Sequence, residues 1–282
     1  MLTRRDLLQS VPLTLTASVF PRAARSYDGG QIYRKGNPTE LSEQYPAYPP
    51  ELIRMFVTVS HFDLNKLKDL IGPHPHLVKS AWDWGFGDWE TPLGAACHMG
   101  RQDIAQFLLS KGATPSLFSW VLFGDLPMVK LIVERQAGIQ RVAGPHSISL
   151  VGHARTGGKQ SEAVLEYLFS LKDADIPKPI DLTEEERAGI CGSYRFGAGP
   201  SQVVEVTDDI SSYLKNSMYT YAPQLNWKRQ GTMERPLFHV GKRVFYPAGS
   251  PSIQIRFEKH ADAIMTISDG EIVLSGSREP SL

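Results

Sequence analysis

Cysteine is scarce in this 282-residue chain, which contains only Cys97 and Cys191. A domain held together by disulfides uses a closely spaced set of cysteines, so we expect neither a disulfide framework nor a bond between these two. A catalytic thiol needs a neighbouring group that lowers its pKa, and no obvious activating partner accompanies either residue in the sequence. Cysteine chemistry is therefore not where we look for function.

The chain also lacks an excess of charge of one sign, because 30 basic residues balance 30 acidic ones. Nucleic-acid binding usually shows as a basic patch, so this balance argues against a general nucleic-acid binder. The sequence contains no phosphate-binding loop, dinucleotide fingerprint, H-E-x-x-H motif or nucleophile elbow. These absences make an enzyme the less favoured interpretation, without deciding the question.

Residues 1–26 are expected to form an export signal. The pair Arg4-Arg5 precedes a short apolar run, and the run is too short to span a bilayer as a mature helix. The pattern resembles a twin-arginine signal, and Arg22 and Arg25 after the run fit that route better than general secretion. No cysteine follows the run, which argues against a lipoprotein anchor. We predict a periplasmic or extracellular protein with a linker at 27–50; the alternative is a frayed N-terminus on a cytoplasmic protein.

The clearest pattern in the chain lies at residues 87–114. Thr91 is a good N-cap, Pro92 is tolerated in the first helical turn, and Gly100 suits the left-handed end of that helix. The stretch resembles the ankyrin repeat, T-P-L-H-x-A-A-x-x-G followed by L-L-x-x-G-A. Gly94 departs from that pattern, because the family usually has histidine there. We therefore expect the adjoining finger to be set differently.

One repeat cannot bury its own apolar face, so neighbouring repeats are expected. Weaker versions of the pattern occur at residues 61–71, 116–133 and 147–169. Degenerate outer repeats are normal because the end units of a solenoid face water. We predict an α-solenoid of about four ankyrin repeats over residues 51–174, without a parallel sheet.

The segment 82–90 is rich in aromatic residues and lies where ankyrin repeats project a binding finger. Exposed aromatic side chains beside acids are typical of interface hot spots. We predict that it contacts a protein partner through Trp82, Trp84, Phe86, Trp89 and Glu90. The alternative is that two of the tryptophans fold back onto the first repeat. The stretch W-D-W-G-x-G-D-W-E-T is similar to stretches in bacterial ankyrin-repeat proteins; this resemblance covers residues 51–170 and implies fold rather than function.

Two histidines, His74 and His76, are close together in a P-H-P-H motif, and His61 and His98 could lie near them. A zinc site needs a converging tetrahedral set of ligands, and no cysteine or glutamate is spaced to complete one. We therefore expect no metal site and no cofactor, and an inter-helix turn at the motif. His153 is expected to be a satisfied residue of a repeat helix rather than a base.

Beyond a proline-containing break at residues 173–181, the hydrophobic period changes from helical to two. Residues 252–258 alternate cleanly, and similar short runs are separated by turn signals. We predict an antiparallel β-barrel or sandwich at residues 181–280. The segment 190–196, with its G-x-Y motif, resembles the opening of small β-barrel domains that follow bacterial envelope serine hydrolases. That resemblance implies an accessory domain without catalytic residues.

A small barrel can also hold a ligand. Five aromatic residues could line such a pocket: Tyr213, Tyr219, Tyr221, Trp227 and Phe245. The alternative, which we favour, is that they fill the core.

The sequence as a whole predicts an exported, two-domain α + β protein that acts as a non-catalytic binding protein or scaffold. The alternative is an envelope enzyme or small-ligand-binding protein whose site lies in the β domain or at its junction with the repeats. The polar candidates for that site are His239, Tyr246, Arg256 and Glu258. A continuous aromatic patch would favour the first interpretation, and a deep pocket with converging titratable groups the second.

Overall fold

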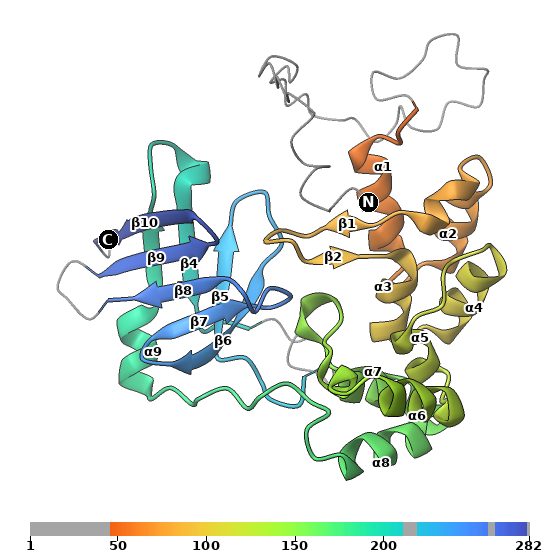
Figure 1. Cartoon of the computed structure of the whole chain (residues 1–282). Helices are drawn as coiled ribbons and strands as arrows, with labels where there is room; N and C mark the ends of the chain where they lie inside the picture. The colour runs from red at the N-terminus through yellow and green to blue at the C-terminus, as the bar shows by residue number, and fades with distance from the viewer. Residues whose placement is uncertain (1–45, 211–218, 259–262, 281–282) are drawn as a thin grey trace, which may run out of the picture. The chain divides into compact units, whose positions relative to one another are not determined.

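The computed structural model describes residues 46–210, 219–258 and 263–280, which belong to one compact unit that begins at Gln44. Helices come first along the chain and strands later (Figure 1). The expected export signal and most of the expected linker lie outside the described residues. Within the described ranges, no helix is both long and apolar enough to cross a bilayer.

Consecutive helix pairs make up the first half of the described chain. The pairs are α1 (Pro50–Val59) with α2 (Leu64–Ile71), α3 (Pro92–His98) with α4 (Gln102–Ser110), α5 (Leu117–Leu122) with α6 (Leu126–Arg135), and α7 (Leu150–Thr156) with α8 (Glu162–Ser170). Short 3₁₀ segments lie between them: η2 (Pro75–Lys79), η3 (Ile139–Arg141), η4 (Pro145–Ser147) and η5 (Gly158–Ser161). Paired helices over residues 51–174 are therefore present, as predicted.

Local signals explain where these helices begin and end. Thr91 caps α3 by accepting a hydrogen bond from the Gly94 backbone N–H. Gly100 and Gly124 end the first helices of two consecutive pairs with φ of +68° and +69°. A Cβ at Gly100 would lie 2.4 Å from the Thr156 carbonyl oxygen, so the turn needs glycine for space as well as for φ. Because both turns carry glycine, a later segment of the chain can pack closely against each of them.

A two-stranded hairpin precedes α3 and lies where the finger of the repeat predicted at residues 87–114 is expected. Strand β1 (Trp82–Asp83) pairs antiparallel with β2 (Trp89–Glu90). Gly85, Phe86 and Gly87 all have positive φ at the tip. We call residues 82–90 the finger hairpin.

The second half begins with α9 (Glu184–Ile190) and continues as a closed antiparallel barrel of eight strands. The strands are β3 (Gly192–Arg195), β4 (Val203–Thr207), β5 (Leu225–Arg229), β6 (Arg235–Gly241), β7 (Val244–Pro247), β8 (Gln254–Phe257), β9 (Ile264–Asp269) and β10 (Ile272–Arg278), with η6 (Pro200–Gln202) before β4. Each strand pairs with the next, and β10 returns to β3. The prediction of an antiparallel β structure is confirmed, as the barrel rather than the sandwich.

Apolar side chains fill the barrel. Alternation along β8 turns Ile255 and Phe257 inward, where Phe257 contacts Tyr194 with ring centroids 5.5 Å apart. Trp227 and Phe245 belong to this core, which confirms core filling for those two residues. Tyr219 and Tyr221 pack on a separate cluster with Phe238. Tyr213 lies outside the described residues.

Candidate functional site

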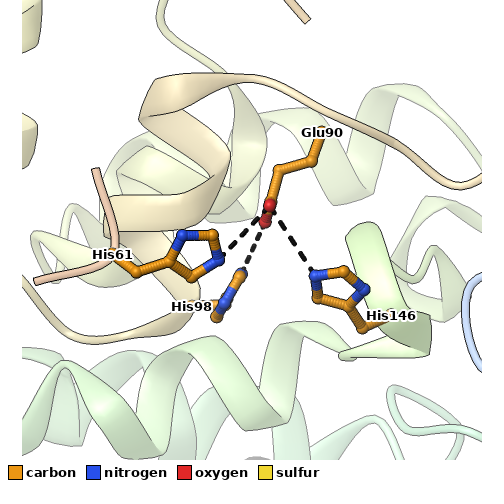
Figure 2. Close-up of side chains that lie close together, drawn as sticks. All are labelled: His61, Glu90, His98 and His146. Atoms are coloured by element: carbon orange, nitrogen blue, oxygen red, sulfur yellow. Dashed lines mark ion pairs between the residues drawn. The ribbon is translucent and has the colours of Figure 1, made fainter. Parts of the chain in front are cut away.

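A buried carboxylate lies at the centre of the candidate site. Glu90 is fully buried, and three imidazoles surround it (Figure 2). His98 Nδ1 lies 3.1 Å from Glu90 Oε1, while His61 Nε2 and His146 Nε2 lie 3.3 Å and 3.7 Å from Oε2. We call these four residues the His–Glu cluster.

Four separate segments bring the cluster together. Strand alternation in β2 turns Trp89 outward and Glu90 inward. His61 lies in the turn between α1 and α2, His98 is the last residue of α3, and His146 lies in η4. Gly94 on α3 lies next to Glu90, since a Cβ there would be in ordinary contact with Glu90 Cγ at 3.8 Å.

Hydrogen bonds orient the side chains of the cluster. His61 Nδ1 lies 3.0 Å from the carbonyl oxygens of Val57 and Thr58, which directs its Nε2 toward Glu90. Trp84 Nε1 donates a 2.7 Å hydrogen bond to Glu90 Oε2. Glu90 Oε1 and His98 Nδ1 are buried and, among the described residues, have no hydrogen-bond partner despite their close approach. The cluster is therefore well ordered but incompletely satisfied.

The pKa values of the residues in the His–Glu cluster are shifted in different directions. Burial alone would raise the pKa of the Glu90 carboxyl, but His98, His146 and His61 together hold that pKa well below its ordinary value. Burial lowers the pKa of His98, which favours the neutral ring. Burial also opposes a charge on His146, yet its hydrogen bond to Asp88 and the nearby Glu90 carboxylate raise its pKa to about 9. These shifts favour an ionised Glu90, a neutral His98 and a charged His146.

A second buried carboxylate, Asp88, lies next to the His–Glu cluster and contacts His146. Asp88 accepts hydrogen bonds from the His146 backbone N–H at 2.9 Å and from the His146 ring Nδ1 at 2.7 Å. It also forms an ion pair with Arg235 of β6, which is only 1% exposed. Burial would raise the pKa of Asp88, but His146 and Arg235 outweigh it and lower that pKa.

Further contacts join the finger hairpin to the barrel. Arg235 Nη2 donates to the Gly85 carbonyl at 3.2 Å, and Phe86 packs edge-on against Trp227 with centroids 5.4 Å apart. Gly249 has φ of +89°, and a Cβ there would lie 2.2 Å from Asp88 Cγ, so only glycine allows this approach. Figure 1 shows the hairpin reaching from α3 toward the strands.

Backbone strain accompanies these contacts. Phe86, His146 and Ser147 adopt left-handed φ values of 60°, 60° and 61°, which are uncommon for residues with a side chain. Such conformations persist where the surroundings determine them, and they concentrate at functional sites. Here the Ser250 hydroxyl donates to the Phe86 carbonyl at 2.8 Å, and the Gly249 N–H donates to the Ser147 hydroxyl at 2.7 Å.

A pocket of about 960 Å³ opens onto the cluster, and we call it the junction pocket. Its walls come from both halves of the chain and include His61, His98, His146, Trp82, Trp84, Tyr219, Met233 and Arg235. Its volume lies in the range of small-molecule sites, about 300–1,000 Å³.

The residues predicted to contact a partner do not form one surface. Trp89 is exposed at 63%, whereas Trp82 lines the junction pocket and Phe86 packs on the barrel. Trp84 donates its indole N–H to Glu90. The assignment of Glu90 to a partner surface is corrected, because a fully buried carboxylate does not reach a partner.

The prediction about which histidines lie together is also corrected. His61 and His98 belong to the cluster, but His74 and His76 of the P-H-P-H motif do not. The argument that no glutamate is spaced to complete a ligand set is wrong, because β2 carries Glu90 to the histidines. His146 gave no signal in the sequence, since it comes from an irregular segment outside the repeat pattern.

The polar candidates of the β domain do not form a common site. Arg256 and Glu258 are exposed, while Tyr246 stacks on Phe238 with centroids 5.2 Å apart. His239 is buried with Nδ1 3.0 Å from the Ile180 carbonyl oxygen.

His153 lies in helix α7, as predicted, and burial lowers its pKa to about 3. Its Nδ1 lies 2.8 Å from the Ser149 carbonyl, while its Nε2 has no hydrogen-bond partner among the described residues. His153 is therefore a neutral residue of the interior.

Comparison with known proteins adds one result. Residues 88–120 match the family model described as Ankyrin repeat. This range begins at Asp88 and contains Glu90, His98 and both helices of the second pair. A repeat of this kind suggests interaction with a protein. No curated protein matches the chain.

Proposed function

We propose that the protein binds a small organic ligand in the junction pocket. The observation that carries the proposal is the convergence of three histidines on a pocket of about 960 Å³, with the buried Glu90 carboxylate directly behind them. An apolar pocket with a few converging polar groups is the usual form of a ligand site. A plain interaction surface would not need buried titratable groups.

The walls indicate the chemistry of the ligand. Trp82, Trp84 and Tyr219 provide aromatic surface, which suits a flat or apolar body. The exposed Arg54 and the histidine edges provide positive or hydrogen-bonding groups, whereas Arg235 is already paired with Asp88. An aromatic or aliphatic molecule with one anionic group fits this combination best.

A panel of aromatic carboxylates, with their neutral amides for comparison, tests the proposal by isothermal titration calorimetry on the full chain. Trp82→Ala should weaken binding of the carboxylates by at least tenfold, since a buried aromatic contact contributes about 1.5–3 kcal/mol. Trp89→Ala is the matched control from the same hairpin, because Trp89 is exposed and does not line the pocket. Absence of binding tighter than about 1 mM, or equal losses in both variants, would refute the proposal.

A protein partner on the helix pairs is the second candidate, and the ankyrin match at residues 88–120 favours it. In this view the pairs α1–α2, α5–α6 and α7–α8 are degenerate ankyrin repeats, and the protein is a non-catalytic scaffold. Trp89, exposed at 63%, is the aromatic residue of the finger hairpin available to such a partner. Affinity capture with the full chain as bait, followed by binding measurements on the captured protein, would identify it.

Export by the twin-arginine route belongs to this proposal, with the barrel as an accessory domain of an envelope protein. Its support is the Arg4-Arg5 pair and the apolar run behind it. Replacing both arginines by lysine should leave the precursor in the cytoplasm. Unchanged export of that variant in a fractionation experiment would contradict it.

A further inference from the structure

We propose that His61, Glu90, His98 and His146 bind one divalent transition-metal ion, for which Zn²⁺ is the best match. Their ligand atoms all lie within 4.8 Å of one another. Three imidazole nitrogens and one carboxylate oxygen form a donor set that zinc accepts readily. Calcium and magnesium prefer sets made of oxygen atoms alone, so the nitrogen-rich cluster argues against them.

The distances fit tetrahedral coordination. Zinc–ligand bonds of about 2.0–2.2 Å place neighbouring donors of a tetrahedron about 3.3–3.6 Å apart. His98 Nδ1 lies 3.1 Å from Glu90 Oε1, His61 Nε2 and His146 Nε2 lie 3.3 and 3.7 Å from Oε2, and the four ligand atoms lie within 4.8 Å of one another, close to these values. An ion can therefore enter between the carboxylate and the rings with only small side-chain movements.

The tautomers of two rings point to the same conclusion. His61 Nδ1 faces two carbonyl oxygens, which only accept hydrogen bonds, so this nitrogen carries the proton. His146 Nδ1 likewise faces the Asp88 carboxylate at 2.7 Å. With Nδ1 protonated, Nε2 of both rings faces the Glu90 carboxylate. Either a second proton on a ring, as on His146 in the metal-free site, or a metal ion can then lie between Nε2 and the carboxylate.

The surroundings resemble the outer shell of a metal site. Metal-bound histidines usually donate their other N–H to a carboxylate or a carbonyl, as His146 and His61 do here. Arg235 in turn holds Asp88. Glu90 Oε1 and His98 Nδ1 are buried without a hydrogen-bond partner within the described part of the chain, and an ion would satisfy both. Because all three histidines line the junction pocket, one side of the ion would face that pocket.

Metal titration of the tag-free full chain tests the inference. After removal of metal by a chelator, Zn²⁺ should bind with one-to-one stoichiometry in calorimetry, and Co²⁺ should give the visible absorption of a tetrahedral site. His61→Ala is the most informative variant, because His61 is 17% exposed and lies in a turn. It should weaken binding at least about 10–100-fold, the loss typical of even an outer-shell change. His76→Ala, an exposed histidine outside the cluster, is the matched control and should bind like the unmodified chain.

Several results would overturn the inference. One is the absence of saturable metal binding to the unmodified chain, which would mean that protons alone hold the cluster. Another is unchanged affinity in both His61→Ala and Glu90→Gln, or an equal loss in His76→Ala. Metal-free melting curves check the folding of each variant, and His61→Ala decides alone if Glu90→Gln does not fold. The inference does not rest on an organic ligand: metal binding without carboxylate binding would remove only the pocket proposal.

Discussion

The barrel and the helix pairs bury different kinds of side chain. Tyr194, Phe245 and Ile255 fill the barrel interior, whereas the helix pairs enclose Glu90 and His98 among apolar residues. Burial of charged or polar groups costs free energy unless partners compensate, so the buried carboxylates and histidines around the finger hairpin, together with Arg235, mark this region as the candidate site. The barrel contributes Arg235 to the site, whose buried guanidinium contacts Asp88 and Gly85 of the finger hairpin as well as the Ala248 carbonyl.

Separating the two halves should have the largest effect. We predict that residues 181–280 fold alone, although this segment lacks the Asp88 partner of Arg235 and the Phe86 contact on Trp227. We expect it to give a strand-type circular dichroism spectrum but to melt well below the full chain. A melting temperature equal to that of the full chain would show that these contacts do not stabilise the barrel.

Arg235→Ala should have the next largest effect, because it leaves Asp88 buried beside an empty space. Removing one partner of a buried ion pair typically costs about 3–5 kcal/mol of unfolding free energy. Urea denaturation measures this cost. The control is Arg141→Ala, which breaks the exposed Arg141–Asp173 pair and should cost at most about 1 kcal/mol. Equal losses in the two variants would contradict the structural role of the buried pair.

Trp84→Phe removes one hydrogen bond to the buried Glu90 carboxylate while keeping an aromatic ring. Hydrogen bonds to charged groups contribute about 1.5–3 kcal/mol, so we expect destabilisation of that order. Denaturant unfolding measures it, and a loss below about 0.5 kcal/mol would show that the histidines alone support Glu90.

Ile255→Val tests the apolar interior of the barrel. Loss of one buried methylene should cost about 0.5–1.5 kcal/mol, without any change in metal or ligand affinity. The same urea experiment, with calorimetry beside it, checks both points. A change in metal affinity would show that the two halves are coupled more tightly than their contacts suggest.

Trp89→Ala should have the smallest effect on stability, within about 0.5 kcal/mol, because the side chain is mostly exposed. If a protein partner binds the finger hairpin, the same change should weaken capture more than tenfold, which corresponds to at least about 2 kcal/mol. A large drop in melting temperature would instead place Trp89 in the core. Normal capture would move the partner surface elsewhere.

Much of the fold follows from short-range signals in the sequence. Thr91, Gly100 and Gly124 mark helix starts and turns within a few residues, and alternation around Ile255 marks a buried strand face. Such signals depend on backbone conformation and on one buried face, so they can be recognised without knowing the partner elements. They located the ankyrin repeat, the helix pairs and the barrel.

The candidate site depended on tertiary structure. His61, Glu90, His98 and His146 come from a turn, a strand, a helix end and a 3₁₀ segment, and no local pattern relates their positions. The proximity of His74 and His76 in sequence was misleading, because side chains form a site only where packing directs them to one point. The sequence thus determined which elements form. Only the packing of the finger hairpin between α3, η4 and the barrel decided that Glu90 meets the three histidines.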